Sequence, residues 1–299
     1  MLALNRSQLV LLTLLTLLWG LNWPIVKLGV MGFPPLSFRS LSMVLGLPVL
    51  AAVLWWMKVP FRLARRHWAE TFWLGMLNLV VWNVCMVLAL RSLPSGRAAI
   101  LGYTMPIFSA LIGTMWFATP MARRGWLGVG AAALGVTLLL WHEMNGLAGR
   151  PLGVALMLLG AASWALGTQM LRRSRIDAPT LTLSFWMTVQ TVVICTVLAV
   201  LFERHEWRMP SPGMSAAIAY NAVLIFGFTQ AAWFTLARGL PPQASTLSTM
   251  MIPILGVFSG AWWLGEVLRW QDWAAMGLMV VALASVLWPA RGTLHLRSK

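Results

Sequence analysis

Apolar residues gather into long runs along the chain, and short segments with charge, proline or glycine separate these runs. A helix that crosses the hydrocarbon layer of a membrane needs about 20 mainly apolar residues. We therefore expect ten transmembrane helices, near residues 8–29, 36–57, 70–90, 97–118, 124–141, 151–171, 180–202, 214–236, 243–264 and 273–289. The connections between them leave no room for a soluble domain, so the pattern predicts an all-α integral membrane protein.

The composition favours the membrane over other partners of a basic protein. Hydrophobic residues make up 60% of the chain and charged residues only 10%, which excludes an ordinary soluble enzyme or a disordered chain. The formal net charge of +15 would indicate nucleic-acid binding in a soluble protein. Here the cations lie between apolar runs, so we expect a lipid bilayer as partner and no nucleic acid. Alternate connections hold most of the Lys and Arg, which predicts that both termini are cytoplasmic.

Two distant stretches of the chain match one another at a constant offset. Residues 93–106 read LPSGRAAILGYTMP and residues 240–253 read LPPQASTLSTMMIP. The same offset pairs Arg91 with Arg238, and chance rarely produces such a pairing in so apolar a chain. We infer two five-helix repeats, residues 1–146 and 147–299. Because five is odd, the second repeat is inverted in the membrane, as in many secondary transporters. A duplicated scaffold without a transport role is the alternative.

Several short motifs are shared with a known family. They are Trp19-Gly20-Leu21-Asn22 followed by Lys27, then Phe38-Arg39, the prolines Pro106 and Pro253, and Gly265-Glu266. In this order they resemble the drug/metabolite transporter superfamily, in its ten-helix EamA-type branch, over nearly the whole chain. The chain departs from the family where Ala118, Thr119 and Pro120 replace a Gly-Glu-like pair, so we expect no acidic counterpart of Glu266 in the first repeat.

The resemblance is greatest to bacterial amino-acid exporters, including those for aromatic amino acids. It implies a secondary transporter in the bacterial inner membrane that exports aromatic and other neutral amino acids by alternating access. The alternative is an exporter of other metabolites or drugs of the same superfamily, such as purines or cationic compounds. The sequence leaves the oligomeric state open, with a monomer among the alternatives.

Polar and aromatic residues in the middle of the apolar runs are the candidates for substrate binding. Lipid offers no hydrogen-bond partners, so such groups face protein or a cavity. Three prolines, Pro24, Pro106 and Pro253, each remove a helical hydrogen bond and free a carbonyl nearby. The predicted substrate-binding residues are Trp19, Asn22, Asn78, Trp82, Asn83, Tyr103, Trp164, Gln230, Trp233 and Ser248.

These candidates favour an uncharged binding site. Lys27, Arg39, Arg91 and Arg97 are all expected near the outer ends of the helices, and no Asp or Glu falls in the middle of a run. We therefore expect a neutral or zwitterionic substrate, and a flux that is facilitated or only weakly coupled to protons. The sequence has no motif of a hydrolase or phosphate-binding enzyme and no cluster of metal ligands, so neither catalysis, a metal nor a cofactor is predicted.

Small residues predict where the two halves approach each other. Gly256-x-x-x-Gly260 is a pattern for close helix packing, and its repeat-related counterpart is Ser109-x-x-x-Gly113. We expect the fourth and ninth helices to meet here, with packing against an unrelated helix as the alternative. By the repeat, Asn83 and Tyr103 lie toward the outside and Gln230 lies toward the inside, where they would line alternately opened vestibules.

Overall fold

The structure, a computed structural model, describes residues 6–118, 121, 123–145, 151–229, 232 and 242–287, and all regular elements of these residues are helical. The first elements are α1 (Arg6–Gly32), α2 (Pro35–Trp56), the 3-10 turn η1 (Arg65–His67), α3 (Trp68–Gly75), the π-helix η2 (Met76–Val80) and α4 (Val81–Ser92). The third apolar run therefore forms one helical stretch with a π-helical segment at its centre.

The remaining helices follow the other apolar runs of the sequence. They are α5 (Ser95–Gly102), α6 (Met105–Phe117), α7 (Arg123–Asn145), α8 (Pro151–Leu171), α9 (Thr180–Glu203), the 3-10 turn η3 (Arg204–Glu206), α10 (Pro212–Ala219), the π-helix η4 (Tyr220–Phe228), α12 (Pro242–Leu264) and α13 (Trp270–Leu287). Helices α2, α8, α10 and α12 each begin with a proline, whose fixed φ suits the first helical turn.

The three prolines expected to free carbonyls differ in their effect. Pro24 and Pro253 lie inside the continuous helices α1 and α12. Pro106 instead follows a break, because α5 ends at Gly102 and α6 begins at Met105. The hydroxyl of Thr104 donates to the carbonyl of Leu101 at 2.6 Å and so satisfies one of the carbonyls at this break.

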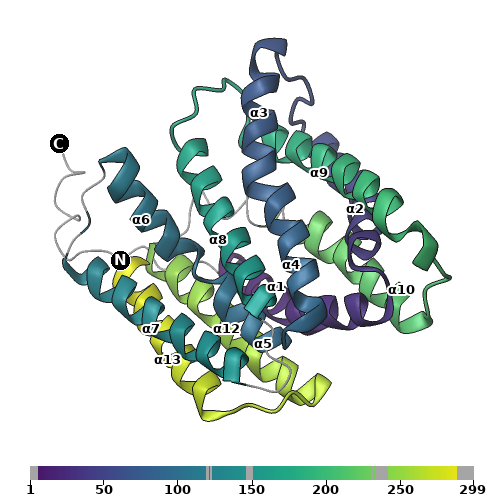
Figure 1. Cartoon of the computed structure of the whole chain (residues 1–299). Coiled ribbons are helices and arrows are strands. Elements are labelled where there is room, and N and C mark those ends of the chain that lie inside the picture. The colour runs from purple at the N-terminus through teal and green to yellow at the C-terminus, as the bar shows by residue number, and fades with distance from the viewer. Residues whose placement is uncertain are drawn as a thin grey trace.

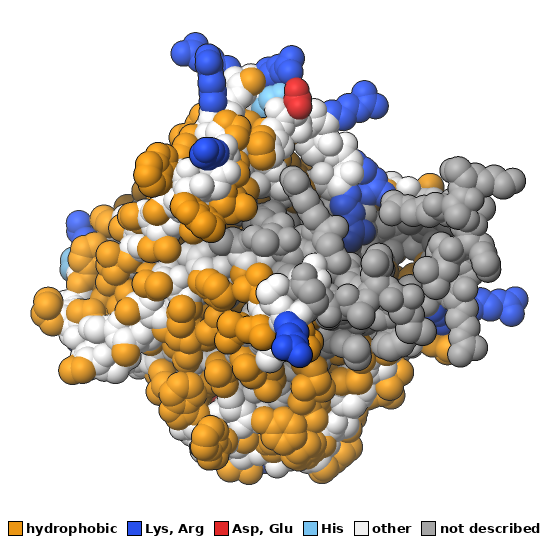
Figure 2. All heavy atoms as spheres, turned by 180° about the vertical axis from the view of Figure 1, so that it is seen from behind, with side chains coloured by type: hydrophobic (Ala, Val, Ile, Leu, Met, Phe, Trp, Pro, Cys, Tyr) orange, Lys and Arg blue, Asp and Glu red, His pale blue; other side chains and the backbone are white. Residues whose placement is uncertain are grey.

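The length and composition of the helices suit a membrane. Six stretches are long and apolar enough to cross one: Arg6–Gly32, Pro35–Trp56, Arg65–Ser92, Ser95–Phe117, Pro151–Leu171 and Thr180–Glu206. Pro212–Phe228 and Met250–Leu264 are shorter apolar helices. Figure 2 shows apolar side chains over the body of one face and basic side chains gathered at its upper end. The number of ten crossings and the inverted insertion remain predictions.

Helix contacts repeatedly join segments from the two predicted repeats. Helix α2 packs against α9, α5 against α12, and α7 against α13, and each of these pairs is related by the predicted offset (Figure 1). Helix α1 contacts α12, α4, α5 and η4, although part of its surface is exposed. We use the term outer end for the layer where α1 ends and α2 begins, following the predicted orientation. Helix α1 therefore contacts helices of both predicted repeats.

Candidate functional site

Two indole rings meet deep inside the helix bundle. Trp23 of α1 and Trp82 of α4 form an edge-to-face pair with 6.4 Å between ring centroids. Trp23 precedes the end of α1 by nine residues, and Trp82 precedes the end of α4 by ten. At 1.5 Å per residue, both residues are about 15 Å from the outer end, which is half the thickness of the hydrocarbon layer. With the helix ends taken as the edge of the hydrocarbon layer, the pair lies near the middle of that layer.

Gly102 allows the two indoles to approach the end of α5. A Cβ atom at this position would lie 2.9 Å from a ring atom of Trp23, 3.1 Å from one of Trp82 and 3.2 Å from the methyl group of Met157 on α8. These three side chains come from α1, α4 and α8, and they surround the break between α5 and α6. An aromatic and polarisable wall thus surrounds the end of α5.

Polar groups adjoin this wall along α8. Asn78 is buried within the π-helix η2, where its Nδ2 donates to the carbonyl of Leu74 at 3.1 Å and its Oδ1 accepts from the hydroxyl of Thr168 at 3.2 Å. Gly167 and Gly160 of α8 lie against Asn78 and Trp82, respectively. Asn78 and Trp82 therefore face the same neighbouring helix, as their spacing predicts.

A second polar group lies on the inner half of α1. The hydroxyls of Thr16 and Ser248 are 2.6 Å apart, which joins α1 to α12. The hydroxyl of Tyr220 in η4 donates to the carbonyl of Leu18 at 2.7 Å. Trp19, directly after Leu18, packs against a small cluster of Leu12, Leu15 and Ala232. Helix α1 is thus held on both sides by hydrogen bonds from the second predicted repeat.

The other candidates from the sequence lie in different surroundings. Asn22 is half-buried, and its Oδ1 is buried without a hydrogen-bond partner. Asn83 is buried and its Nδ2 donates to Leu79 of its own helix at 2.7 Å, so it does not line an open vestibule in this conformation. Tyr103 is half-buried against the main core, and Trp164 is half-buried on α8. Gln230 and Trp233 lie outside the described residues.

Several residues of this region are absent from the sequence prediction. Trp23, Thr16, Tyr220 and Thr168 all contact predicted candidates or the helix that carries them. A signal for two of them was available, because Thr16, Trp19 and Trp23 follow one another at spacings of three and four residues, which places them on one face of α1. No comparable pattern marks Tyr220 or Thr168.

Most of the charged residues near the outer end have local partners. The ammonium of Lys27 donates to the carbonyls of Leu90 and Leu93 at 2.7 and 2.9 Å. Arg97 forms an ion pair with Asp272, with 2.6 Å between Nε and Oδ1. Arg39 differs from the expectation for an outer-end residue: its side chain is 1% exposed and its guanidinium lies over the ring of Phe226. The backbone of Arg39 is near the outer end, but its head group is inside the bundle.

Two glutamates join helices of the two repeats at the outer end. Glu203, at the end of α9, accepts from the backbone N–H groups of Leu36 and Ser37 at 3.0 and 2.7 Å. Glu266, after α12, accepts from the N–H groups of Ser95 and Gly96 at 2.6 and 3.2 Å. Each carboxylate therefore binds the N-terminus of a helix from the other predicted repeat.

The fourth and ninth apolar runs meet, as the small-residue pattern predicts. Gly256 of α12 lies against Ala99, and Gly260 lies against Ser95, both on α5. The repeat-related pattern of Ser109 and Gly113 packs against α8 instead. The side-chain amide of Gln169 on α8 donates to the carbonyl and hydroxyl of Ser109 at 2.7 and 2.9 Å, and Gly113 also faces Gln169. Only one of the two patterns therefore forms the contact between these runs.

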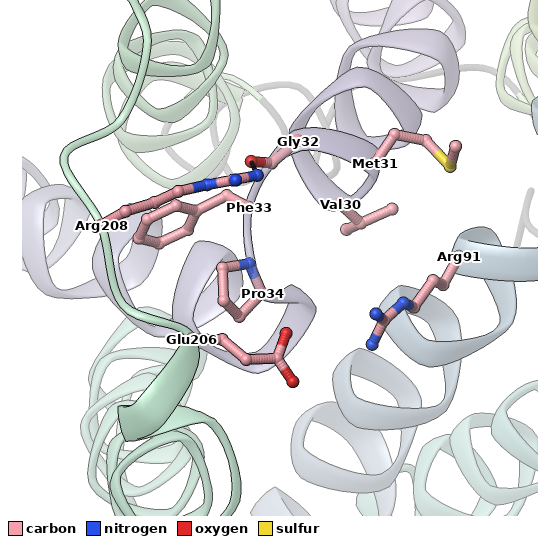
Figure 3. A pocket seen from close by; sticks show the side chains of 8 residues that line it. All are labelled: Val30, Met31, Gly32, Phe33, Pro34, Arg91, Glu206 and Arg208. Atoms are coloured by element: carbon pink, nitrogen blue, oxygen red, sulfur yellow. Dashed lines mark hydrogen bonds between the residues drawn. The ribbon is translucent and has the colours of Figure 1, made fainter.

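A pocket of about 520 Å³ lies at the outer end, away from the indole pair. It is lined by Val30, Met31, Gly32, Phe33, Pro34, Arg91, Glu206 and Arg208. Figure 3 shows Arg91 and Glu206 extending from different elements toward its centre. Arg208 donates to the carbonyl of Gly32 at 2.8 Å. None of the predicted binding residues that the structure describes lines this pocket.

Comparison with known proteins places the chain in a family of transporters. The EamA-like transporter family matches it twice, over residues 6–141 and 151–288. A solved structure, titled only "Crystal structure of protein", shares the fold with a TM-score of 0.68 and 18% identity, covering 97% of this chain and all of that one.

Curated bacterial proteins are similar over most of their length. The "Uncharacterized inner membrane transporter YedA" of Escherichia coli K12 is 27% identical, with 93% of this chain and 91% of that protein covered. The "Uncharacterized transporter YoaV" of Bacillus subtilis is 23% identical over 82% and 84% of the two chains. A "Probable amino-acid metabolite efflux pump" of E. coli K12 is 22% identical over 93% and 94%. The chain therefore belongs to the EamA-like transporter family of the drug/metabolite transporters, and it is a membrane transporter rather than an enzyme.

Proposed function

We propose that this transporter exports aromatic and other neutral amino acids across the bacterial inner membrane. The observation that carries the proposal is the mid-membrane cluster of Trp23, Trp82 and Met157 around Gly102, with Asn78 beside it. Indole and thioether groups accept apolar side chains, and amides provide hydrogen bonds to an amino acid. The name of the similar E. coli efflux pump points to the same substrate class.

Alternating access between two inverted five-helix repeats is the mechanism that we propose. The repeat-related contacts of α2 with α9, α5 with α12, and α7 with α13 support it, since each would be a sliding surface between halves. In this view ten helices cross the membrane, both termini are cytoplasmic, and residues 1–146 and 147–299 form the two repeats. The mid-membrane cluster is then exposed to one side at a time.

The test is counterflow of labelled L-phenylalanine in proteoliposomes that contain the purified protein. We expect saturable counterflow, and we expect Trp82→Ala to lower the apparent affinity about tenfold because the indole wall is lost. Trp262→Ala is the matched control, since Trp262 is 91% exposed and should leave affinity unchanged. Competition by neutral amino acids would support the proposal. Competition only by purines or cationic dyes would overturn it in favour of the other substrate classes.

A further inference from the structure

Arg39 carries a buried charge, and two of its three guanidinium nitrogens have no hydrogen-bond partner. Its side chain is 1% exposed, and its Nε and Nη2 atoms are buried without a hydrogen-bond partner. The guanidinium lies over the ring of Phe226 at 5.4 Å, which stabilises the charge but accepts no conventional hydrogen bond. Burying a charge is costly unless it is both paired and hydrogen-bonded. The position therefore calls for an anion.

No described carboxylate supplies that anion. Glu203 reaches the start of the same helix, but its oxygens accept from the backbone of Leu36 and Ser37 and from the Ser37 hydroxyl. Asp272 is bound by Arg97. The cation of Arg39 is thus left for a partner from outside the described chain.

The two unused atoms of Arg39 lie on one edge of the guanidinium and match a carboxylate. The same pair of atoms binds a carboxylate elsewhere in this protein: Nε and Nη2 of Arg97 donate to the two oxygens of Asp272 at 2.6 and 3.2 Å. Such a planar fork is the geometry in which arginine recognises carboxylates. The Arg97–Asp272 pair is therefore an internal example of the contact that Arg39 lacks.

The helix opposite Arg39 offers a complementary group. Phe226 belongs to the π-helix η4, and π-helical segments are frequent at functional sites. Asn221 precedes Phe226 by five residues, which is about one turn when hydrogen bonds run from i to i+5. Asn221 is fully buried; its Nδ2 donates to the carbonyl of Ala217 at 3.1 Å, and its Oδ1 has no partner. One face of η4 therefore carries both the ring under Arg39 and an unused acceptor.

We call the contact surface between α2 and η4 the seam. Deeper in the membrane than Arg39, the two helices pack closely along it. A Cβ atom at Gly46 would lie 2.8 Å from Phe226 and 2.9 Å from the carbonyl of Ala222, and Gly227 lies against Val49. Gly46 follows Arg39 by seven residues, about 10 Å along the helix. The Cβ atom of Phe226 therefore lies against α2 near Gly46, while its ring lies under the guanidinium of Arg39.

We propose that the seam between α2 and η4 is a carboxylate-binding site, in which Arg39 binds the carboxylate of the transported solute and Asn221 Oδ1 accepts from its ammonium. The inference rests on the proposed amino-acid transport and adds a chemical requirement: the solute carries a carboxylate. The seam opens to the solute during the transport cycle. Amines, purines and cationic dyes lack this group and bind weakly.

The experiment compares three ligands of equal aromatic size on the purified full-length protein. L-Phenylalanine has both charged groups, L-phenylalaninamide lacks the carboxylate, and 3-phenylpropionate lacks the ammonium. Binding is measured as ligand-dependent thermal stabilisation. We expect the wild type to bind L-phenylalanine at least about tenfold more tightly than the amide, the size expected for a charged hydrogen bond. In Arg39→Gln this preference should fall below about twofold, while Arg66→Gln, which removes an exposed cation, should keep it.

The outcomes separate this inference from the proposed function. Equal binding of L-phenylalanine and its amide by the wild type would overturn the carboxylate site while leaving amino-acid transport intact. Binding of 3-phenylpropionate without any binding of amino acids would remove the proposed function and keep the carboxylate site. A full carboxylate preference in Arg39→Gln would also overturn the site. If Arg39→Gln does not fold, Arg39→Lys, which keeps the charge, replaces it. The comparison of L-phenylalanine with L-phenylalaninamide on the wild type still tests the carboxylate site.

Discussion

At the scale of single residues, Gly102 controls how closely two indole rings and a methionine side chain from three helices approach. Its missing side chain leaves room for ring atoms of Trp23 and Trp82 and for the methyl group of Met157. The indole rings are rigid and the nearest atom of Trp23 would lie only 2.9 Å from a Cβ atom at Gly102, so the new atom would force at least one of these side chains out of its present position. The indole pair would then change its geometry without any change in its own sequence.

We predict that Gly102→Ala impairs transport more than it impairs folding. The added methyl group would overlap with Trp23 and Trp82, and such overpacking typically costs about 1–3 kcal/mol of stability. The measurement is L-phenylalanine counterflow together with the melting temperature of the purified protein. Gly130→Ala is the matched control, because nothing lies within 4 Å of its new Cβ atom and alanine favours a helix. Unchanged counterflow in Gly102→Ala would contradict the role of the indole pair.

Residue spacing predicts which side chains share a helix face, but it does not predict which neighbour they meet. Asn78 and Trp82 were identifiable because they are four residues apart in an apolar run, and both do face α8. The spacing of Trp19 and Trp23 places both on one face of α1, but only the fold shows that Trp23 meets Trp82. Arg39 was assigned to the outer end because sequence position reports backbone depth, whereas the direction of its long side chain depends on Phe226.

At the scale of helices, Glu203 and Glu266 tie the two predicted repeats together. Glu203 follows α9 and binds the start of α2, while Glu266 follows α12 and binds the start of α5. In each case a carboxylate accepts the free N–H groups of a helix N-terminus, where the helix dipole favours negative charge. The inner counterparts by the offset of the repeat are Trp56 and Thr119, neither of which is acidic. The hydrogen bonds from these carboxylates to helix N-termini are therefore a feature of the outer end.

We predict that Glu266→Gln weakens the closure of the outer end. A neutral amide loses the charge that stabilises two backbone hydrogen bonds, with a cost of about 1–2 kcal/mol by analogy with helix capping. The check is the melting temperature and the labelling rate of a cysteine placed at Gly96, which faces α12. Stability should fall and labelling should rise. Glu70→Gln, an exposed site in the first turn of α3, is the control. If neither the melting temperature nor the labelling rate changes, the contact of Glu266 with α5 is not needed for closure of the outer end.

Helix positions were predictable from the apolar runs, but irregularities within helices were not. The runs near 36–57 and 151–171 correspond to α2 and α8 almost residue for residue. The π-helix η2 depends on a neighbour, since the hydroxyl of Ser163 on α8 donates to the freed carbonyl of Leu77 at 2.9 Å. Hydropathy carries no information about such a contact, because it counts apolar residues and ignores which helix lies alongside.

At the scale of the whole molecule, the described acidic residues are placed at the ends of the helices rather than at the mid-membrane cluster. The two buried ones, Glu203 and Asp272, are bound to a helix N-terminus and to Arg97. The histidines whose side chains are described, His67 and His205, lie in the short turns η1 and η3. A transporter that couples solute movement to protons usually carries a titratable group within the membrane. Among the side chains that the structure describes, no carboxylate or imidazole adjoins Trp23 and Trp82.

We therefore predict that amino-acid flux through this protein is facilitated or only weakly coupled to protons. Proteoliposomes loaded with a pH-sensitive dye should show L-phenylalanine flux down its own gradient with far fewer than one proton moved per amino acid. An imposed pH gradient should not drive accumulation of the amino acid against its concentration gradient. Liposomes without protein correct for passive leakage of both species. A fixed stoichiometry of protons to amino acid would contradict the prediction and would require a titratable group in contact with the solute pathway, for which Glu203→Gln and Asp272→Asn would be the first variants to measure.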